Sequence, residues 1–254
     1  MKIFLITILL SISTLQQLLA REEGQIEITT EEGIEVFQSE KYYLLKNNVI
    51  ITSDDFQLKA NLVKAFYEKD LYDITKIESE GNTLFTSKKG MSANGEILNF
   101  SPQNETISIK GKNSSLIINQ IKMFSSDSIF LDNILGTFNI IGENAKLITE
   151  DISISGNSIE GKYINVNDTN EVIYLNVEDD KHSNIITSSL NMFSDKAKYN
   201  KKENIIELFE NVEIERNNET ITGDYAIINT LNESYKIQSK NSKKVKLLIN
   251  NANE

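Results

Sequence analysis

The chain has 254 residues, of which 39% are hydrophobic and 25% charged, and it contains no cysteine, no tryptophan and one proline. This composition excludes a collagen-like chain, a disulfide-stabilised scaffold and a strongly disordered chain. The formal net charge is −11, and the only arginines are Arg21 and Arg216. A nucleic-acid partner is therefore not expected, because phosphate binding depends on clustered lysine and arginine.

Residues 1–20 have the layout of a secretory signal peptide. Lys2 precedes an apolar stretch that runs to about Ile12, and Ala20 lies just before the charged Arg21. Polar residues within 13–17 end the apolar stretch before it reaches the roughly 20 residues that a transmembrane helix needs. We predict that the segment is cleaved after Ala20, with a retained membrane anchor as the alternative.

The rest of the chain alternates apolar and polar residues, as in Ile26-Glu-Ile28 and Val212-Glu-Ile214. This period is typical of a strand with one buried and one solvated face. Clusters of Asn, Asp and Ser separate the alternating runs and indicate turns. The stretch from Phe56 to Leu62 alternates like a strand, although Leu58, Leu62 and Phe66 also fit helical spacing; the surrounding repeat favours a strand.

Similar segments recur along the chain at intervals of about 30 residues, which indicates one structural unit copied several times. The equivalent positions are Asn61, Gly95, Asp127, Gly161, Ser194 and Gly223. Many short strands with regular turns predict an all-β stack, which could be a jelly roll, a sandwich or a solenoid. We predict one elongated domain over residues 25–240, followed by a terminal edge strand and a frayed tail over 241–254.

Two parts of the sequence resemble the repeat of the OstA-like (LptA) family of lipopolysaccharide-transport proteins. Between Asn204 and Ser239 an apolar alternation leads through a turn and a polar hairpin to Ile221-Thr-Gly223-Asp224, and similar elements run from Ile26 to Phe85. The chain departs from the pattern in having extra units over about 113–191. Asn47 and Glu210 also stand where the repeat has a turn glycine.

The resemblance implies an elongated β-jelly roll of antiparallel strands, in which two facing sheets leave an apolar groove. In a periplasmic transport protein of this kind, the groove would hold the acyl chains of lipid A, because exposing them to water costs about 0.8 kcal/mol per CH₂. The alternating inward residues are the predicted lipid-binding positions, although such residues can also simply fill a core. They are Ile26, Ile28, Ile34, Val36, Tyr43, Leu45, Phe85, Leu98, Phe100, Ile107, Ile109, Ile206, Leu208, Val212 and Ile214.

The partners that the resemblance implies are lipopolysaccharide and the inner-membrane and outer-membrane components of the transport machinery. End-to-end assembly with a second copy would pair the edge strands at 25–29 and 243–249. The lysines Lys243, Lys244 and Lys246 are equally consistent with protection of an edge against aggregation. Two alternatives remain open: an inner-membrane-anchored jelly-roll partner of the same pathway, and a β-solenoid that binds or cleaves polysaccharide.

The sequence gives little support for catalysis. His182, the one histidine, lies in the polar stretch from Glu178 to Asn184 together with Asp179 and Asp180. We predict a solvated loop there rather than a metal site. The chain has no cysteine and lacks the G-x-S-x-G and H-E-x-x-H motifs. Neither a catalytic residue nor a metal or cofactor is predicted.

Overall fold

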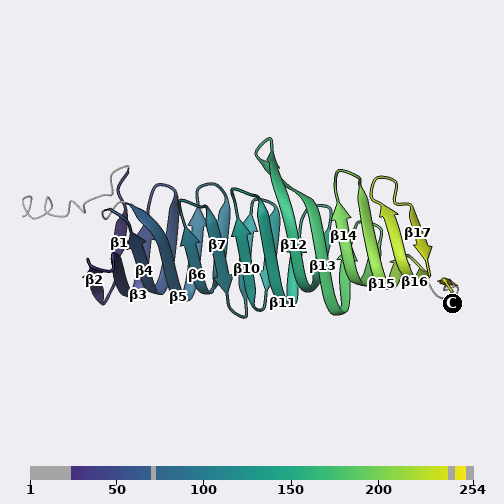
Figure 1. The fold of residues 1–254 in the computed structure, drawn as a ribbon, viewed down its shortest axis with the longest axis horizontal. Coiled ribbons are helices and arrows are strands. Elements are labelled where there is room, and N and C mark those ends of the chain that lie inside the picture. Colours follow the sequence, from purple (N-terminus) through teal and green to yellow (C-terminus); the bar gives the residue numbers. More distant parts are fainter. Residues whose placement is uncertain (1–23, 70–72, 240–243, 250–254) are drawn as a thin grey trace, which may run out of the picture.

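The computed structural model describes residues 24–69, 73–239 and 244–249, and these form an elongated stack of strands (Figure 1). The predicted signal peptide and residues 250–254 of the predicted tail lie outside this part of the chain. Within the described ranges every regular element is a strand. No helix there is long and apolar enough to cross a membrane.

Eighteen strands are found in the described residues, and consecutive strands follow one another along the stack. Their bounds are β1 Glu27–Thr29, β2 Gly33–Phe37, β3 Tyr42–Thr52, β4 Phe56–Tyr67, β5 Ile74–Ser87, β6 Met91–Ser101, β7 Thr106–Lys110, β8 Ser114–Ile118, β9 Ile121–Ser125, β10 Ser128–Asp132, β11 Thr137–Ile148, β12 Ser153–Val166, β13 Thr169–Ile186, β14 Asn191–Asn200, β15 Ile205–Arg216, β16 Glu219–Asn229, β17 Tyr235–Gln238 and β18 Lys246–Ile249. The ambiguous stretch from Phe56 to Leu62 belongs to β4, which confirms the strand prediction.

All these strands belong to one sheet with antiparallel pairing. The long strands β3 to β6 and β11 to β16 pair with their sequence neighbours. Between them, β6 pairs with β7 along one half and with β8 along the other, and β11 likewise pairs with β10 and β9. The all-β jelly-roll prediction is confirmed, and the two facing sheets are the two halves of one continuous sheet.

The long strands bend near their middles, where the pairing register shifts. The bend of β3 contains Asn47 and Asn48, and the bend of β15 contains Glu210 and Asn211. These four residues have φ between 49° and 65°, the left-handed region that disfavours most side chains. Asn47 and Glu210 therefore keep a left-handed backbone at positions where the repeat has glycine.

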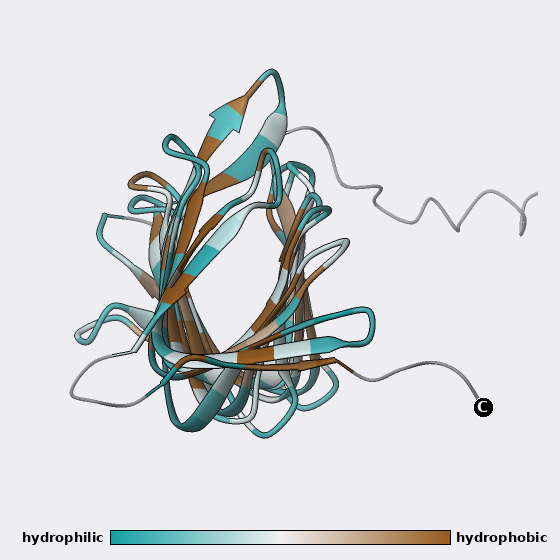
Figure 2. Ribbon diagram, turned by 90° about the vertical axis from the view of Figure 1, so that its right-hand side faces the viewer, coloured by the Kyte–Doolittle hydropathy of each residue, from teal (hydrophilic) through white to brown (hydrophobic). Residues whose placement is uncertain are grey.

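The bends divide the sheet into two walls. Wall 1 contains β2, β7, β10 and β17 with the halves of the long strands that pair alongside them; wall 2 contains β1, β8, β9 and β18 with the other halves. Figure 2 looks along the stack and shows the two walls facing each other. A core of apolar side chains from both walls fills the space between them.

Buried hydroxyl groups lie at the bends and satisfy backbone groups there. The Thr83 hydroxyl donates to the Gly95 carbonyl oxygen at 2.8 Å, and the Ser183 hydroxyl donates to the Ser194 carbonyl oxygen at 2.6 Å. A bulge removes backbone groups from the strand ladder, and an unpaired buried carbonyl is costly. These side chains therefore let the strands bend inside an otherwise apolar core.

The structure corrects two sequence predictions. The stretch from Glu178 to Asn184 is not a loop but part of β13, and it contains that strand's bulge. Gly161 is not equivalent to the repeat positions at the bends, because it pairs with Phe138 within wall 1. A Cβ at Gly161 would lie 2.2 Å from Cζ of Phe138, so this glycine marks close packing rather than a bend.

Candidate functional site

The two walls end in hairpin loops that face each other along one side of the stack, and we call the opening between these loops the mouth. Cavity 1 lies in the mouth and has a volume of about 690 Å³. Loops and strand ends of both walls line it, including Ser87 and Asn119 from wall 2 and Asn133 and Tyr163 from wall 1. Its size falls within the roughly 300–1,000 Å³ of small-molecule sites.

The floor of cavity 1 is apolar and rich in aromatic rings. The ring of Phe85 lies 5.6 Å from that of Phe56 and 4.8 Å from that of Phe100, between centroids. Met91, Ile107 and Ile118 complete the floor. Phe56 and Phe85 come from wall 2, and Phe100 comes from wall 1, so the cluster joins the two walls. Such a floor suits an apolar ligand group.

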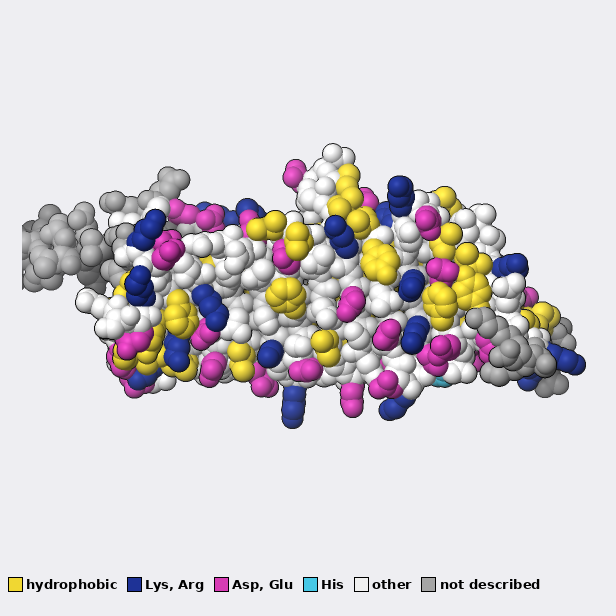
Figure 3. All heavy atoms as spheres, viewed as in Figure 1, with side chains coloured by type: hydrophobic (Ala, Val, Ile, Leu, Met, Phe, Trp, Pro, Cys, Tyr) yellow, Lys and Arg dark blue, Asp and Glu magenta, His cyan; other side chains and the backbone are white. Residues whose placement is uncertain are grey.

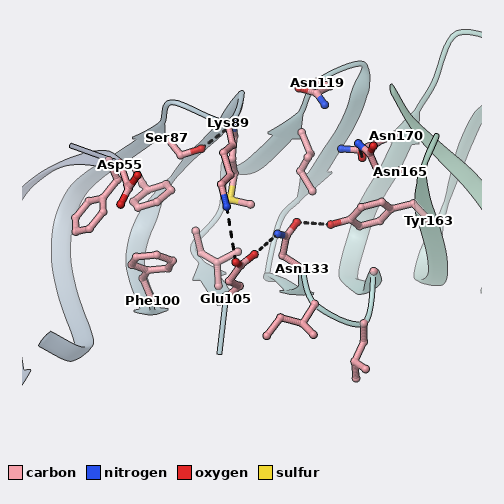
Figure 4. Close-up of a pocket in the computed structure, with 18 of the residues that line it drawn as sticks. Asp55, Ser87, Lys89, Phe100, Glu105, Asn119, Asn133, Tyr163, Asn165 and Asn170 are labelled. Atoms are coloured by element: carbon pink, nitrogen blue, oxygen red, sulfur yellow. Dashed lines mark hydrogen bonds and ion pairs between the residues drawn. The ribbon is translucent and has the colours of Figure 1, made fainter. Parts of the chain in front are cut away.

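A chain of polar contacts runs across the rim of cavity 1 (Figure 4). Lys89 Nζ of wall 2 lies 3.8 Å from Glu105 Oε1 of wall 1. The amide of Asn133 donates to Glu105, and the hydroxyl of Tyr163 donates to Asn133 Oδ1 at 2.6 Å. The ion pair between Lys89 and Glu105 is weak, because the Lys89 side chain is 80% exposed and water screens the two charges.

Tyr163 should ionise late, because burial and the nearby carboxylates of Glu105 and Asp132 raise its pKa to about 12. The folded state then keeps a proton that an unfolded tyrosine loses near pH 10. The stability that this confers is present below pH 10 and is lost as the pH rises toward 12. In alkaline titrations followed by tyrosinate absorbance, Tyr163→Phe should remove one late-titrating group, and an unchanged titration curve would contradict the assignment.

Cavity 2 lies further along the mouth and has a volume of about 640 Å³. Wall 2 contributes the β11–β12 and β13–β14 loops, and wall 1 contributes the β14–β15 and β16–β17 loops. The two cavities are separated by a contact across the mouth, in which Gln120 Nε2 of wall 2 donates to the backbone oxygen of Asn170 in wall 1 at 2.5 Å.

Most of the predicted lipid-binding residues lie in the packed core rather than in an open groove. Tyr43, Leu45, Phe85, Leu98, Ile107, Ile109, Ile206, Leu208, Val212 and Ile214 are buried. Of the fifteen predicted positions, those that line cavity 1 are Phe85, Phe100 and Ile107.

The remaining predicted positions are less covered. Ile26 and Ile28 are partly buried against the core. Ile34 and Val36 are 49% and 50% exposed, although they pair with the buried Leu45 and Tyr43. They share the inner face with these partners, but β2 is the end strand of wall 1 in the described residues, so nothing there covers them.

The polar residues of the mouth were not found from the sequence. Lys89, Glu105, Gln120 and Asn133 lie in or beside turns, where charged and amide side chains are common and carry no periodic signal. The spacing of the turns along the repeat could have shown that these loops gather on one side. It could not have shown which of them touch.

His182 contacts a neighbouring strand at the bulge of β13. Its Nδ1 lies 3.3 Å from Asp195 Oδ1, and the Asp179 carboxylate accepts hydrogen bonds from the backbone N–H groups of Lys181 and His182. Asp179 thus stabilises the bulge of β13. Among the described residues, no group of three or more histidine, aspartate or glutamate side chains is arranged to hold a metal ion.

Charged groups of both signs are mixed on one face of the stack. On the face seen in Figure 3, acidic and basic side chains are interspersed, with hydrophobic side chains between them. The described residues on this face form no extended basic patch.

Comparison with known proteins gives a family match over part of the chain. Residues 28–137 match the family described as LptA/(LptD N-terminal domain) LPS transport protein. No curated protein matches the chain by sequence. Among solved structures, it is similar to LptH, the LptA homologous periplasmic component of the lipopolysaccharide transport device from Pseudomonas aeruginosa. The identity is 13%, the TM-score is 0.43, and the similarity covers 51% of this chain and 94% of LptH.

The family match agrees with the amino-terminal resemblance noted in the sequence. It contains the three aromatic residues of the cavity 1 floor and ends at residue 137. The second resembling segment, Asn204 to Ser239, lies beyond it, where the same antiparallel sheet continues. Residues 28–137 therefore resemble the LptA/LptD N-terminal family of lipopolysaccharide transport proteins, and this match covers less than half of the chain.

Proposed function

We propose that the protein is a periplasmic carrier that binds lipopolysaccharide through its acyl chains and passes it from the inner toward the outer membrane. The observation that carries this proposal is cavity 1, which has an aromatic floor and opens to the surface between the walls. It lies largely within the residues that match the lipopolysaccharide-transport family. An acyl chain placed there is shielded from water, which stabilises it by about 0.8 kcal/mol per CH₂.

The volume of cavity 1 limits how much lipid it can hold with the walls in this position. If a methylene group occupies about as much space as a water molecule, roughly 30 Å³, then about 690 Å³ accommodates some twenty such groups. That is enough for one or two acyl chains. A lipid with more chains would need the walls to part, beginning with the weak contact between Lys89 and Glu105.

The carrier role includes further parts of the chain. Residues 1–20 act as a cleaved signal peptide, and the described domain binds the lipid. Inner-membrane and outer-membrane components of the transport machinery, or a second copy, pair with the ends of the stack. In support of such pairing, β2 and β17 each have a strand partner on one side only within the described residues. Free strand edges of this kind accept a further strand.

Photo-crosslinking to purified lipopolysaccharide tests the proposal. A photoreactive residue at Phe100 should form adducts, because this side chain lines cavity 1. The matched control is Ile97, a residue of the same strand that is 37% exposed and does not line the cavity. Because the floor excludes water and retains acyl chains, we expect at least about tenfold more adduct at Phe100. Equal labelling at both positions of a folded protein would overturn the proposal.

A further inference from the structure

Cavity 2 has an apolar floor beneath a largely polar rim, to which Glu150, Asp151, Lys201 and Glu233 contribute charged groups. Its floor contains Ile152, Leu190 and Ile228, which are no more than 7% exposed. These residues come from both walls, as do the rings of the cavity 1 floor. At the rim lie Ile186 and Leu231, which are 45% and 76% exposed. Exposed leucine and isoleucine around an apolar floor mark a place where an apolar group can be covered.

The contact between Gln120 and Asn170 is well placed to separate the two cavities. Gln120 lies in the turn between β8 and β9, which is the last wall 2 loop that lines cavity 1. Asn170 is 7% exposed, and its side-chain oxygen accepts a hydrogen bond from Asn165 Nδ2 at 3.0 Å. The backbone oxygen that Gln120 reaches is therefore held in place by the β12–β13 hairpin, which projects from the stack in Figure 1.

Further polar contacts close the far side of cavity 2. Ser188 Oγ of wall 2 lies 3.4 Å from Glu233 Oε1 of wall 1, and Arg216 lies 3.8 Å from the other oxygen of the same carboxylate. Cavity 2 is thus bounded across the mouth at both ends. The hydrogen bond of Gln120 to Asn170 crosses the mouth between the loops that line cavity 1 and those that line cavity 2.

We infer that cavity 2 is a second, separate acyl-chain site, so that one protein chain holds lipid at two positions divided by the Gln120–Asn170 contact. This inference rests on the proposed function of cavity 1. It extends that function to residues 149–233, outside the part of the chain that matches the family. Lipid then moves along the protein in discrete steps between two sites, rather than sliding through one continuous groove.

The test uses photoreactive residues at two exposed leucines of wall 1 and at an outward control. Leu135 lies at cavity 1 and Leu231 at cavity 2, while Phe130 is 45% exposed and lines neither cavity. With purified lipopolysaccharide, both leucine positions should form adducts, and the Phe130 position should not. Adducts at Leu135 alone would overturn the second site while leaving the carrier function intact. Adducts at none of them would overturn both.

A charge placed at cavity 2 tests whether the two sites are separate. Ile186→Asp should reduce the adduct at Leu231 by about tenfold, because it removes an apolar contact and because an acyl chain lying there would displace water from the new carboxylate. The adduct at Leu135 should stay within about twofold, since the two cavities share no lining residue. Tyr174→Asp is the matched control: Tyr174 is a similarly exposed residue of β13 that lines neither cavity. Equal loss of both adducts in Ile186→Asp would show one continuous site and overturn the inference.

Discussion

Replacing Phe85 by alanine should lower the free energy of unfolding by about 3–5 kcal/mol, the usual cost of deleting a buried phenylalanine ring. Phe85 is 2% exposed, and its ring packs against those of Phe56 and Phe100. The loss combines the transfer of the ring to water with the void that remains. Because the void opens into cavity 1, water can enter it, and the cost should fall toward the lower end of this range. Urea unfolding measures the change.

Phe130→Ala is the matched control for this change. Phe130 lies on β10 with its side chain 45% exposed, between the buried Ile129 and Leu131. Removing an exposed ring leaves no internal void, so we expect a loss below about 1 kcal/mol. If both variants lost the same stability, the three-ring cluster would not be a packed joint between the walls.

Replacing Gly136 by alanine should destabilise the protein by about 2–5 kcal/mol and disturb the rim of cavity 1. Gly136 has a φ of 65°, and a Cβ added there would lie 2.3 Å from the backbone oxygen of Tyr163. The left-handed backbone costs about 1–2 kcal/mol for a residue with a side chain, and crowding against the backbone adds about 1–3 kcal/mol. The β10–β11 loop must therefore move away from the β12–β13 hairpin.

Two measurements separate the cost of the left-handed backbone from the cost of crowding against Tyr163. Gly24→Ala shares the left-handed backbone, with a φ of 83°, but a Cβ there has no atom within 4 Å, so it should show only the smaller, conformational loss. In Gly136→Ala, the hydroxyl of Tyr163 should also move from Asn133, and its pKa should fall from about 12 toward the ordinary value of 10. Equal stability of the two variants, with an unchanged Tyr163 titration, would contradict the predicted contact.

The fold could be predicted because its signals are local. Alternation such as Val212-Glu-Ile214 places one face of a strand in the core, and both apolar residues are 1% exposed in the structure. The same reasoning correctly assigned the stretch from Phe56 to Leu62 to a strand. Ile34 and Val36 show its limit, because alternation identifies the inner face but not the end of the stack, where that face is uncovered.

The bends and the mouth could not be predicted because they depend on contacts between distant segments. Polarity suggested a loop at residues 178–184, yet the Ser183 hydroxyl reaches a carbonyl of β14 and the strand continues. Gly161 fits the repeat interval, but the reason for a glycine there is the ring of Phe138, which only the pairing of β11 with β12 reveals. The contact of Gln120 with Asn170 spans fifty residues of sequence.

The neighbour-to-neighbour pairing of the long strands has a consequence for how the chain acquires its structure. From β11 to β16, each new strand needs only the strand before it as a template. Such a chain can nucleate at one hairpin and order progressively along its length, as stacked repeats do. A duplicated unit would lengthen the stack by about 4.8 Å per strand in each wall and leave the cross-section unchanged. Copying whole units could thus add further cavities to the mouth without redesigning the core.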